Sequence, residues 1–285
     1  MSIVVSGGRV PFAGEAYVYW GAASPPTLLA NYTELKHPSG PHADDLWGMD
    51  VASGNIVDAV APGCDDVIIG RYNAPLGGLA NAGDIVLFAG PSLTTSYVVG
   101  EPGGPVLGAD FGWSIGVGRY DGDSLLDLAV SAPGDPGSSP CVGQIFIFPG
   151  ASFPASVASF VANPPSLTAD DLFGYDLVWG DRDGDGIDEL LVGSPWFDYH
   201  QPAPPGYRGE GRCVLKKFTA PANTTTIDDP SDEELPGSFL PYRWGHALAS
   251  GRLDTNARID FAIGNAMATY QTISQAGEVR VVIYQ

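Results

Sequence analysis

The chain has 285 residues, with 33 acidic and 13 basic side chains and a formal net charge of −20. Nucleic acid is not an expected partner, because phosphate binding needs clustered cations, and membrane insertion is not expected, because no run of about 18 apolar residues is present. The 38 glycines and 25 prolines favour turns over long helices. Three cysteines, Cys64, Cys141 and Cys213, show neither a disulfide framework nor metal-ligand spacing.

Four aromatic-glycine pairs recur along the chain and mark an internal repeat. They are Trp47-Gly48, Phe111-Gly112, Phe173-Gly174 and Trp244-Gly245. We expect each pair to start a strand, at 49–51, 113–117, 175–179 and 246–249. A polar loop that opens with glycine then leads to a second strand, at 67–70, 128–133, 190–193 and 261–264. Third strands are expected at 84–90, 144–150, 212–218 and 278–284, and a weaker fourth strand at positions such as 95–100.

Repeated units of four antiparallel strands are typical of a β-propeller. Residues 2–6 match the second strand of a unit and residues 15–21 match the third, so the sequence predicts about four and a half blades of an all-β propeller, as a partial or open ring. We expect one domain over 1–285, with a blade fragment at 1–46 and repeats at 47–110, 111–172, 173–243 and 244–285.

The most acidic loop of the chain lies between 180 and 190. Asp181, Asp183 and Asp185 occupy alternate positions, and Glu189 closes the series. Side chains at every second position of a tight loop can converge, and Ca²⁺ takes six to eight oxygen ligands. An EF-hand is excluded, because a short apolar strand and not a helix follows Glu189. The alternative to a calcium site is a solvated acidic turn.

The second and fourth loops have a similar pattern with fewer acids. Oxygen-bearing residues recur at their third, fifth and ninth positions, and these are Asp121, Asp123 and Asp127 in the second loop and Asp254, Asn256 and Asp260 in the fourth. Arg119 and Arg252 stand where the third loop has Asp181. Each loop could therefore bind Ca²⁺ or form a metal-free arginine–carboxylate cluster. The first loop, between 54 and 66, has an apolar filling, and we expect no metal there.

The order of aromatic-glycine, acidic loop, a strand ending in Gly193-Ser194-Pro195 or Ser131-Ala132-Pro133, and a further apolar strand resembles the FG-GAP repeat of integrin α-chain β-propellers. That family forms rings of about seven blades with Ca²⁺ in the loop between the first two strands of a blade. The resemblance implies three ligand sets in this chain. They are Asp181, Asp183, Asp185, the Ile187 carbonyl and Glu189; Asp121, Asp123, the Leu125 carbonyl and Asp127; and Asp254, Asn256, the Arg258 carbonyl and Asp260. Arg119, Arg252 and the small number of blades depart from the family pattern.

The resemblance also implies a function, a non-catalytic extracellular or cell-surface module for ligand binding or adhesion. A protein or glycan would bind through loops, and further blades or another subunit would complete the ring. A lectin-type propeller and an accessory domain of a larger secreted hydrolase, such as a phospholipase, are the alternatives. Because residues 1–5 do not form a signal peptide, the chain is either cytoplasmic or part of a longer secreted protein. Two glycosylation sequons, at Asn31 and Asn223, are close to the number expected by chance.

Enzyme activity is not expected from these residues. A calcium ion saturated by protein oxygens has no open position for chemistry, there is no Gly-x-Ser-x-Gly nucleophile motif, and the four histidines lack zinc-site spacing. The aromatic and proline-rich segment 196–208 is either a ligand-contact surface or a packed surface loop.

Overall fold

The computed structural model describes residues 3–6, 13–20, 32–40, 43–57, 63–134, 143–154, 158–160, 171–197, 211–218, 223–228, 243–256, 258–266 and 278–282. Within these residues the chain is all-β, and its helical content is one short 3₁₀ turn, η1 (Gly150–Ser152). None of the described helical segments is long and apolar enough to cross a bilayer. The scarcity of helix agrees with the glycine- and proline-rich composition.

The described strands form five antiparallel sheets, each of which follows the order of the sequence. The first sheet contains β1 (Ile3–Ser6), β2 (Ala16–Tyr19) and β3 (Tyr32–Leu35). The second contains β4 (Val51–Gly54), β5 (Asp66–Arg71), β6 (Asp84–Ala89) and β7 (Thr95–Gly100). The third contains β8 (Ile115–Gly118), β9 (Asp127–Ala132), β10 (Gln144–Phe148) and β11 (Ala158–Phe160). The fourth contains β12 (Leu177–Gly180), β13 (Glu189–Ser194), β14 (Arg212–Lys217) and β15 (Asn223–Asp228). The fifth contains β16 (Trp244–Gly251), β17 (Asp260–Asn265) and β18 (Glu278–Val282).

Three first strands begin later than the sequence predicted. The expected starts at 49, 113 and 175 are wrong by two residues, because β4, β8 and β12 start at Val51, Ile115 and Leu177. The glycine of each aromatic-glycine pair has a positive φ, between 82° and 93° in these three repeats, which an extended strand does not accommodate. In these three repeats the aromatic-glycine pair therefore lies before the strand. In the fourth repeat the expected start at 246 is also wrong, because β16 begins at Trp244 and includes Gly245 (φ 84°), next to a register shift between Trp244 and Ala247.

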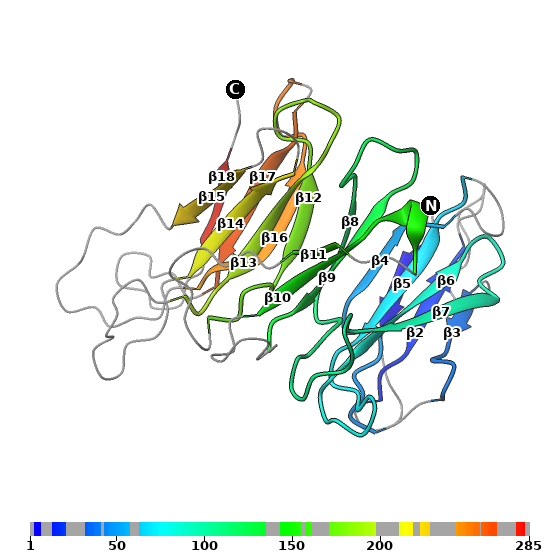
Figure 1. Ribbon diagram of the computed structural model, residues 1–285. Helices are drawn as coiled ribbons and strands as arrows, with labels where there is room; N and C mark the ends of the chain where they lie inside the picture. Colours follow the sequence, from blue (N-terminus) through cyan, green and yellow to red (C-terminus); the bar gives the residue numbers. More distant parts are fainter. Residues whose placement is uncertain are drawn as a thin grey trace, which may run out of the picture.

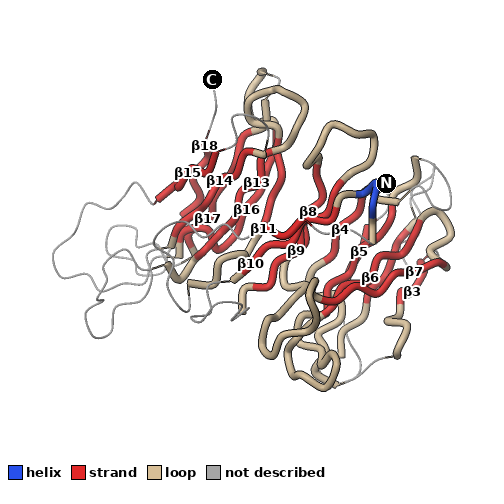
Figure 2. Tube along the Cα trace, in the orientation of Figure 1, coloured by secondary structure: helices blue, strands red, loops and turns tan. Residues whose placement is uncertain are grey.

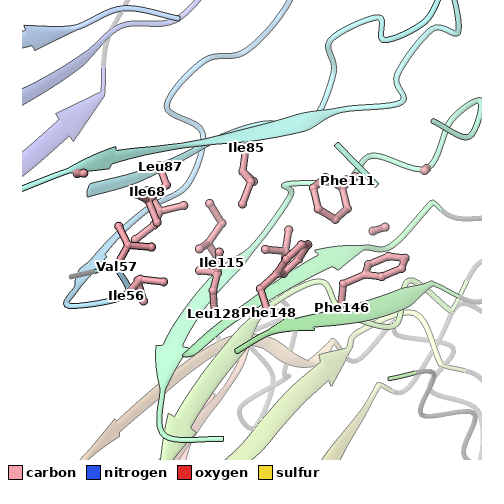
Figure 3. Packing of buried hydrophobic residues seen from close by; sticks show 14 residues of the cluster. Ile56, Val57, Ile68, Ile85, Leu87, Phe111, Ile115, Leu128, Phe146 and Phe148 are labelled. Carbon is pink, nitrogen blue, oxygen red and sulfur yellow. The ribbon is translucent and has the colours of Figure 1, made fainter. Parts of the chain in front are cut away.

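Both faces of the inner strands are buried, because the five sheets stack on one another. Ile68 and Leu87 of the second sheet pack against Leu128 of the third sheet (Figure 3). Ile69, which alternates with Ile68 along β5, packs on the other side against Val18 of the first sheet. Successive side chains of a strand point to opposite faces, so one strand contributes to two hydrophobic cores.

The same alternation continues toward the C-terminus. Ile145 of the third sheet packs with Leu190 of the fourth, and Leu191, the next residue, packs with Phe261 of the fifth. Strands buried on both faces read as continuous apolar runs, as β13 and β9 do in this sequence.

Consecutive sheets form a row in the order of the sequence. The first strands β4, β8, β12 and β16 lie next to one another. Figure 1 shows the sheets following one another from the blue N-terminal sheet to the orange and red C-terminal sheet, and Figure 2 shows the same row of strands in the same orientation. This arrangement is that of neighbouring propeller blades. The partial or open propeller ring and the assignment of the whole chain to one domain stay predictions.

Candidate metal centre

The loop of the fourth sheet holds the best candidate for a metal site. It connects β12 to β13 at one end of the hairpin, so that residues 181–188 project from the sheet. Asp181 Oδ1 accepts hydrogen bonds from the backbone N–H of Gly184 (2.7 Å) and Asp185 (3.1 Å), and its Oδ2 accepts one from Gly186 (3.0 Å). Gly184 and Gly186 have φ values of 81° and 89°, and this left-handed backbone turns the N–H groups toward Asp181.

Three predicted ligands converge in this loop. Oxygen atoms of Asp181, Asp183 and Glu189 all lie within 4.8 Å of one another. Two oxygens bound to one Ca²⁺ at 2.3–2.6 Å are at most about 5 Å apart, so these carboxylates fit one calcium ion. Elsewhere in the described part of the chain, no further group of three acidic, histidine or cysteine side chains converges in this way.

A lysine that sequence analysis did not single out lies against the same carboxylates. Lys217, the last residue of β14, contacts Asp183 Oδ2 through its Nζ, which also lies 3.1 Å from Asp185 Oδ2 and 3.8 Å from Glu189 Oε1. Its side chain is only 13% exposed. The hydrogen bond with Asp183 raises the pKa of Lys217, so the lysine is an ammonium ion. It was missed because Lys217 is 28 positions beyond Glu189 in sequence, and only strand pairing brings the two together.

Glu189 differs from the other ligands by its burial. It starts β13, its side chain is 2% exposed, and its Oε2 accepts a hydrogen bond from the Arg182 N–H (2.9 Å). Burial raises the pKa of Glu189, and the neighbouring charge of Asp183 raises it further. A divalent cation would offset both effects, because it favours the ionised carboxylate.

The second and fourth loops fold like the third at their centre but gather fewer carboxylates. In all three loops, the side-chain oxygen of the fifth residue accepts a hydrogen bond from the backbone N–H of the seventh residue. The pairs are Asp123 with Leu125 (2.8 Å), Asp185 with Ile187 (3.0 Å) and Asn256 with Arg258 (2.8 Å). The third-position residues Asp121 and Asp254 likewise accept the N–H of Asp123 and Asn256. Metal binding at these two loops, and by the carbonyls of Leu125, Ile187 and Arg258, stays a prediction.

The ninth-position carboxylate has a structural role in every loop. Asp127 Oδ2 accepts the N–H of Tyr120 (2.7 Å), and its Oδ1 accepts the N–H of Gly150 (2.9 Å), beyond β10. Asp260 Oδ2 accepts the N–H of Leu253 (2.9 Å). Burial raises the pKa of Asp127, and these backbone donors oppose the rise.

Asp66 has the same structural role in the first loop. Its loop is apolar, yet Oδ2 accepts the N–H of Ile56 (2.9 Å) and Val57 (2.8 Å), and Oδ1 accepts that of Gly90 (3.0 Å). The ninth position therefore fastens the loop to the end of the third strand.

Adjacent loops are joined by a hydrogen bond that repeats from sheet to sheet. The residue before each ninth-position carboxylate donates its backbone N–H to a backbone carbonyl in the loop of the preceding sheet. These hydrogen bonds run from Leu126 to Asn55 (2.8 Å), from Asp188 to Arg119 (2.8 Å) and from Ile259 to Asp181 (2.9 Å). Asp188 Oδ2 also accepts the Arg119 N–H (2.7 Å). The candidate ligand Asp181 is thus fastened to the fourth loop through its backbone.

The opposite ends of these hairpins present a strip of half-buried aromatic rings. We call this the aromatic strip, and it comprises Tyr72, Trp113, Tyr175, Trp196 and His246. Neighbouring ring centroids are 4.4 Å apart for Tyr72 and Trp113, 5.3 Å for Trp113 and Tyr175, and 5.1 Å for Tyr175 and Trp196. Three members follow an aromatic-glycine pair directly, which is a signal that the sequence analysis did not use.

Several predicted features fall outside the described residues. These are Cys141, His42, His200, Asn31 and most of the proposed contact segment, residues 198–208. Trp196 and Phe197 are the described beginning of the contact segment.

Comparisons with known proteins agree with the geometry of the loops. A family model described as the FG-GAP repeat matches residues 111–146 and 173–212, which include the second and third loops and the strands that flank them. The chain contains FG-GAP repeats. Its relatives include integrin alpha-PS5 of Drosophila melanogaster, 30% identical over 168 residues, which are 56% of this chain and 15% of that protein. Integrin alpha-PS2 of the same organism is 30% identical over 121 residues, 42% of this chain and 8% of that protein.

The FG-GAP chain is therefore distantly similar to integrin alpha chains, and the similarity covers a small share of their length. The resemblance drawn from the aromatic-glycine pairs and acidic loops is confirmed. The matched segment 173–212 contains the acidic triad of Asp181, Asp183 and Glu189.

Proposed function

We propose that this chain is a non-catalytic, Ca²⁺-stabilised propeller module that binds a ligand outside the cell or at the cell surface. The observation that carries the proposal is the convergence of Asp181, Asp183 and Glu189 within a matched FG-GAP repeat. Buried or crowded carboxylates repel one another unless a cation neutralises them, and the calcium ion would supply that charge without an open position for catalysis.

The aromatic strip supports the ligand-binding part of the proposal. Clustered Trp and Tyr rings are enriched in protein-binding hot spots, where they contribute contact area and a polar group. Arg243 lies over the Trp196 ring at 4.3 Å, so a polar and charged edge borders the strip. The strip is at the far end of the hairpins from the acidic loops, which leaves it accessible when Ca²⁺ is bound.

A binding assay on immobilised basement-membrane extract tests this part. The full chain in CaCl₂ should bind, and Trp113→Ala and Trp196→Ala should each weaken binding by about tenfold, which is the effect of a moderate hot-spot residue. Val98→Ala, at a residue of β7 that is 47% exposed and lies outside the strip, is the control and should bind as the wild type does. Absence of wild-type binding, or equal binding by all variants, would contradict the ligand-binding proposal.

A saccharide-binding function is the second candidate, and a cavity between the first two sheets favours it. The cavity has a volume of about 140 Å³, and Glu15, Glu34, His37, Asp45 and Trp47 are among its lining residues. Asp45 Oδ1 is buried without a hydrogen-bond partner in the described structure, and a hydroxyl group could satisfy it, while His37 Nε2 lies 3.4 Å from Asp84 Oδ2. A glycan array tests this function, since retention that Glu34→Gln reduces would support a lectin and silence over all glycans would exclude it.

A further inference from the structure

The ammonium group of Lys217 lies where a cation would bind in the acidic loop. Its Nζ is in contact with Asp183 Oδ2 and lies 3.1 Å from Asp185 Oδ2 and 3.8 Å from Glu189 Oε1. Asp183 and Glu189 belong to the triad that fits one calcium ion. An ammonium and a Ca²⁺ ion cannot share these oxygens, because the two cations would repel one another at contact distance.

The lysine is specific to this repeat. In the second and third sheets the same position, at the end of the third strand, is occupied by Ala89 and Pro149, and the next residue is glycine. There the N–H of Gly90 or Gly150 satisfies the second oxygen of the ninth-position Asp. In the fourth sheet, the longer Glu189 directs its Oε1 toward Lys217 instead. At this position the side chain is therefore neutral in the second and third sheets and cationic in the fourth sheet, whose loop has the most acidic residues.

We propose that Lys217 is a tethered cation that occupies the acidic loop when Ca²⁺ is absent and must withdraw before Ca²⁺ binds, so that it sets the calcium affinity of the loop. This inference rests on the proposed calcium site. The flexible four-carbon stem of lysine allows its charge to move without a change in the strand. Asp183 and Asp185 are about one-third exposed, so the ammonium can leave toward solvent.

A tethered competitor has a quantitative consequence. The apparent dissociation constant equals the intrinsic one divided by the fraction of molecules whose site is open. If Lys217 occupies the loop in about nine molecules of ten, its removal strengthens calcium binding about tenfold. A lysine whose ammonium lay outside the ion's position would not weaken calcium binding, and a lysine that held the carboxylates in place for the ion would strengthen calcium binding.

Isothermal titration of the chelator-treated full chain with CaCl₂ distinguishes these cases. Lys217→Met should lower the dissociation constant about tenfold, and Lys216→Met should leave it at the wild-type value. Lys216→Met is the matched control because it removes the same charge from the neighbouring residue of β14. The side chain of Lys216 points to the opposite face of the strand from that of Lys217. In EDTA, thermal unfolding of Lys217→Met should occur at a lower temperature than that of the wild type, because the carboxylates lose their counter-ion.

Each result decides the proposal. Equal affinity in wild type and Lys217→Met, weaker binding in Lys217→Met, or an equal gain in Lys216→Met would overturn the role of Lys217 and leave the calcium site intact. Binding seen only in Lys217→Met would support the proposal, with the lysine acting as a nearly complete block. No calcium binding by any of the three proteins would overturn the calcium site itself, and the inference with it.

Discussion

Two kinds of buried carboxylate occur among the described residues, those held by backbone N–H groups and those that also face a cation, and the two kinds differ in what their removal should cost. Asp66 belongs to the first kind, since its side chain accepts three backbone N–H groups in a loop without other acids. Glu189 belongs to the second kind, because it faces Lys217 and the acidic loop. Asp66 and Glu189 occupy the same position in their repeats, so the difference between them comes from the neighbouring residues.

Asp66→Ala should destabilise the chain by about 3 kcal/mol or more, because three buried N–H groups lose their acceptor. Chemical denaturation measures the loss, and it should be the same with and without Ca²⁺. Asp65→Ala, at the exposed neighbouring position, should change stability by less than about 0.5 kcal/mol. Similar losses in the two variants would show that Asp66 does not fasten its loop.

Asp176 should make stability depend on pH. Burial raises the pKa of Asp176 to about 6, although the hydrogen bonds from the N–H groups of Leu248 and Leu177 lower the pKa in part. Between about pH 4 and 6 the folded chain retains a proton that the unfolded chain has lost, so the unfolding free energy falls as the pH rises through this range. Asp176→Ser, which copies Ser114 at the equivalent position of the preceding repeat, should reduce that slope. An NMR titration midpoint for Asp176 near 4 would contradict the prediction.

At the scale of elements, close backbone contacts fix the spacing between sheets. Gly14, Gly83, Gly143 and Gly211 each precede the third strand of a unit and have positive φ values. A Cβ atom at Gly83 would lie 2.1 Å from the Phe111 carbonyl oxygen, so the glycine is required by both its conformation and its neighbour.

Gly83→Ala should therefore be strongly destabilising, by about 4 kcal/mol or more, since the neighbouring sheet has to move. Gly103→Ala is the matched control, because Gly103 also has a positive φ (94°) but nothing within 4 Å of an added Cβ. Its cost should be about 1–2 kcal/mol, from the backbone conformation alone. Equal unfolding midpoints for the two variants would show that the contact with Phe111 does not matter.

The repeat made most of the elements predictable from sequence. The aromatic-glycine pairs and apolar runs located the strands of the described structure, and the acidic spacing located the triad of Asp181, Asp183 and Glu189. The partners of these elements were not predictable, because Lys217 reaches Glu189 through strand pairing and Leu126 reaches Asn55 through sheet stacking. Neither contact leaves a local pattern in the sequence.

For the whole molecule, the acidic loops lie along one edge of a row of stacked sheets, and backbone hydrogen bonds join each loop to the next. A cation at the third loop would therefore stabilise the row beyond its own hairpin. With a net charge of −20, bound Ca²⁺ also reduces the electrostatic repulsion of the folded chain.

The most direct test of this account is thermal unfolding of the chelator-treated chain with and without CaCl₂. Wild type should gain stability with Ca²⁺, by about 2.7 kcal/mol when the free ion is at 100 times its dissociation constant. Asp183→Asn should abolish that gain, whereas Asp121→Asn and Asp254→Asn should retain it, because their loops do not bring three carboxylates together. A wild-type protein that does not respond to Ca²⁺, or an Asp183→Asn protein that keeps the full gain, would contradict the assignment of the third loop as the calcium site.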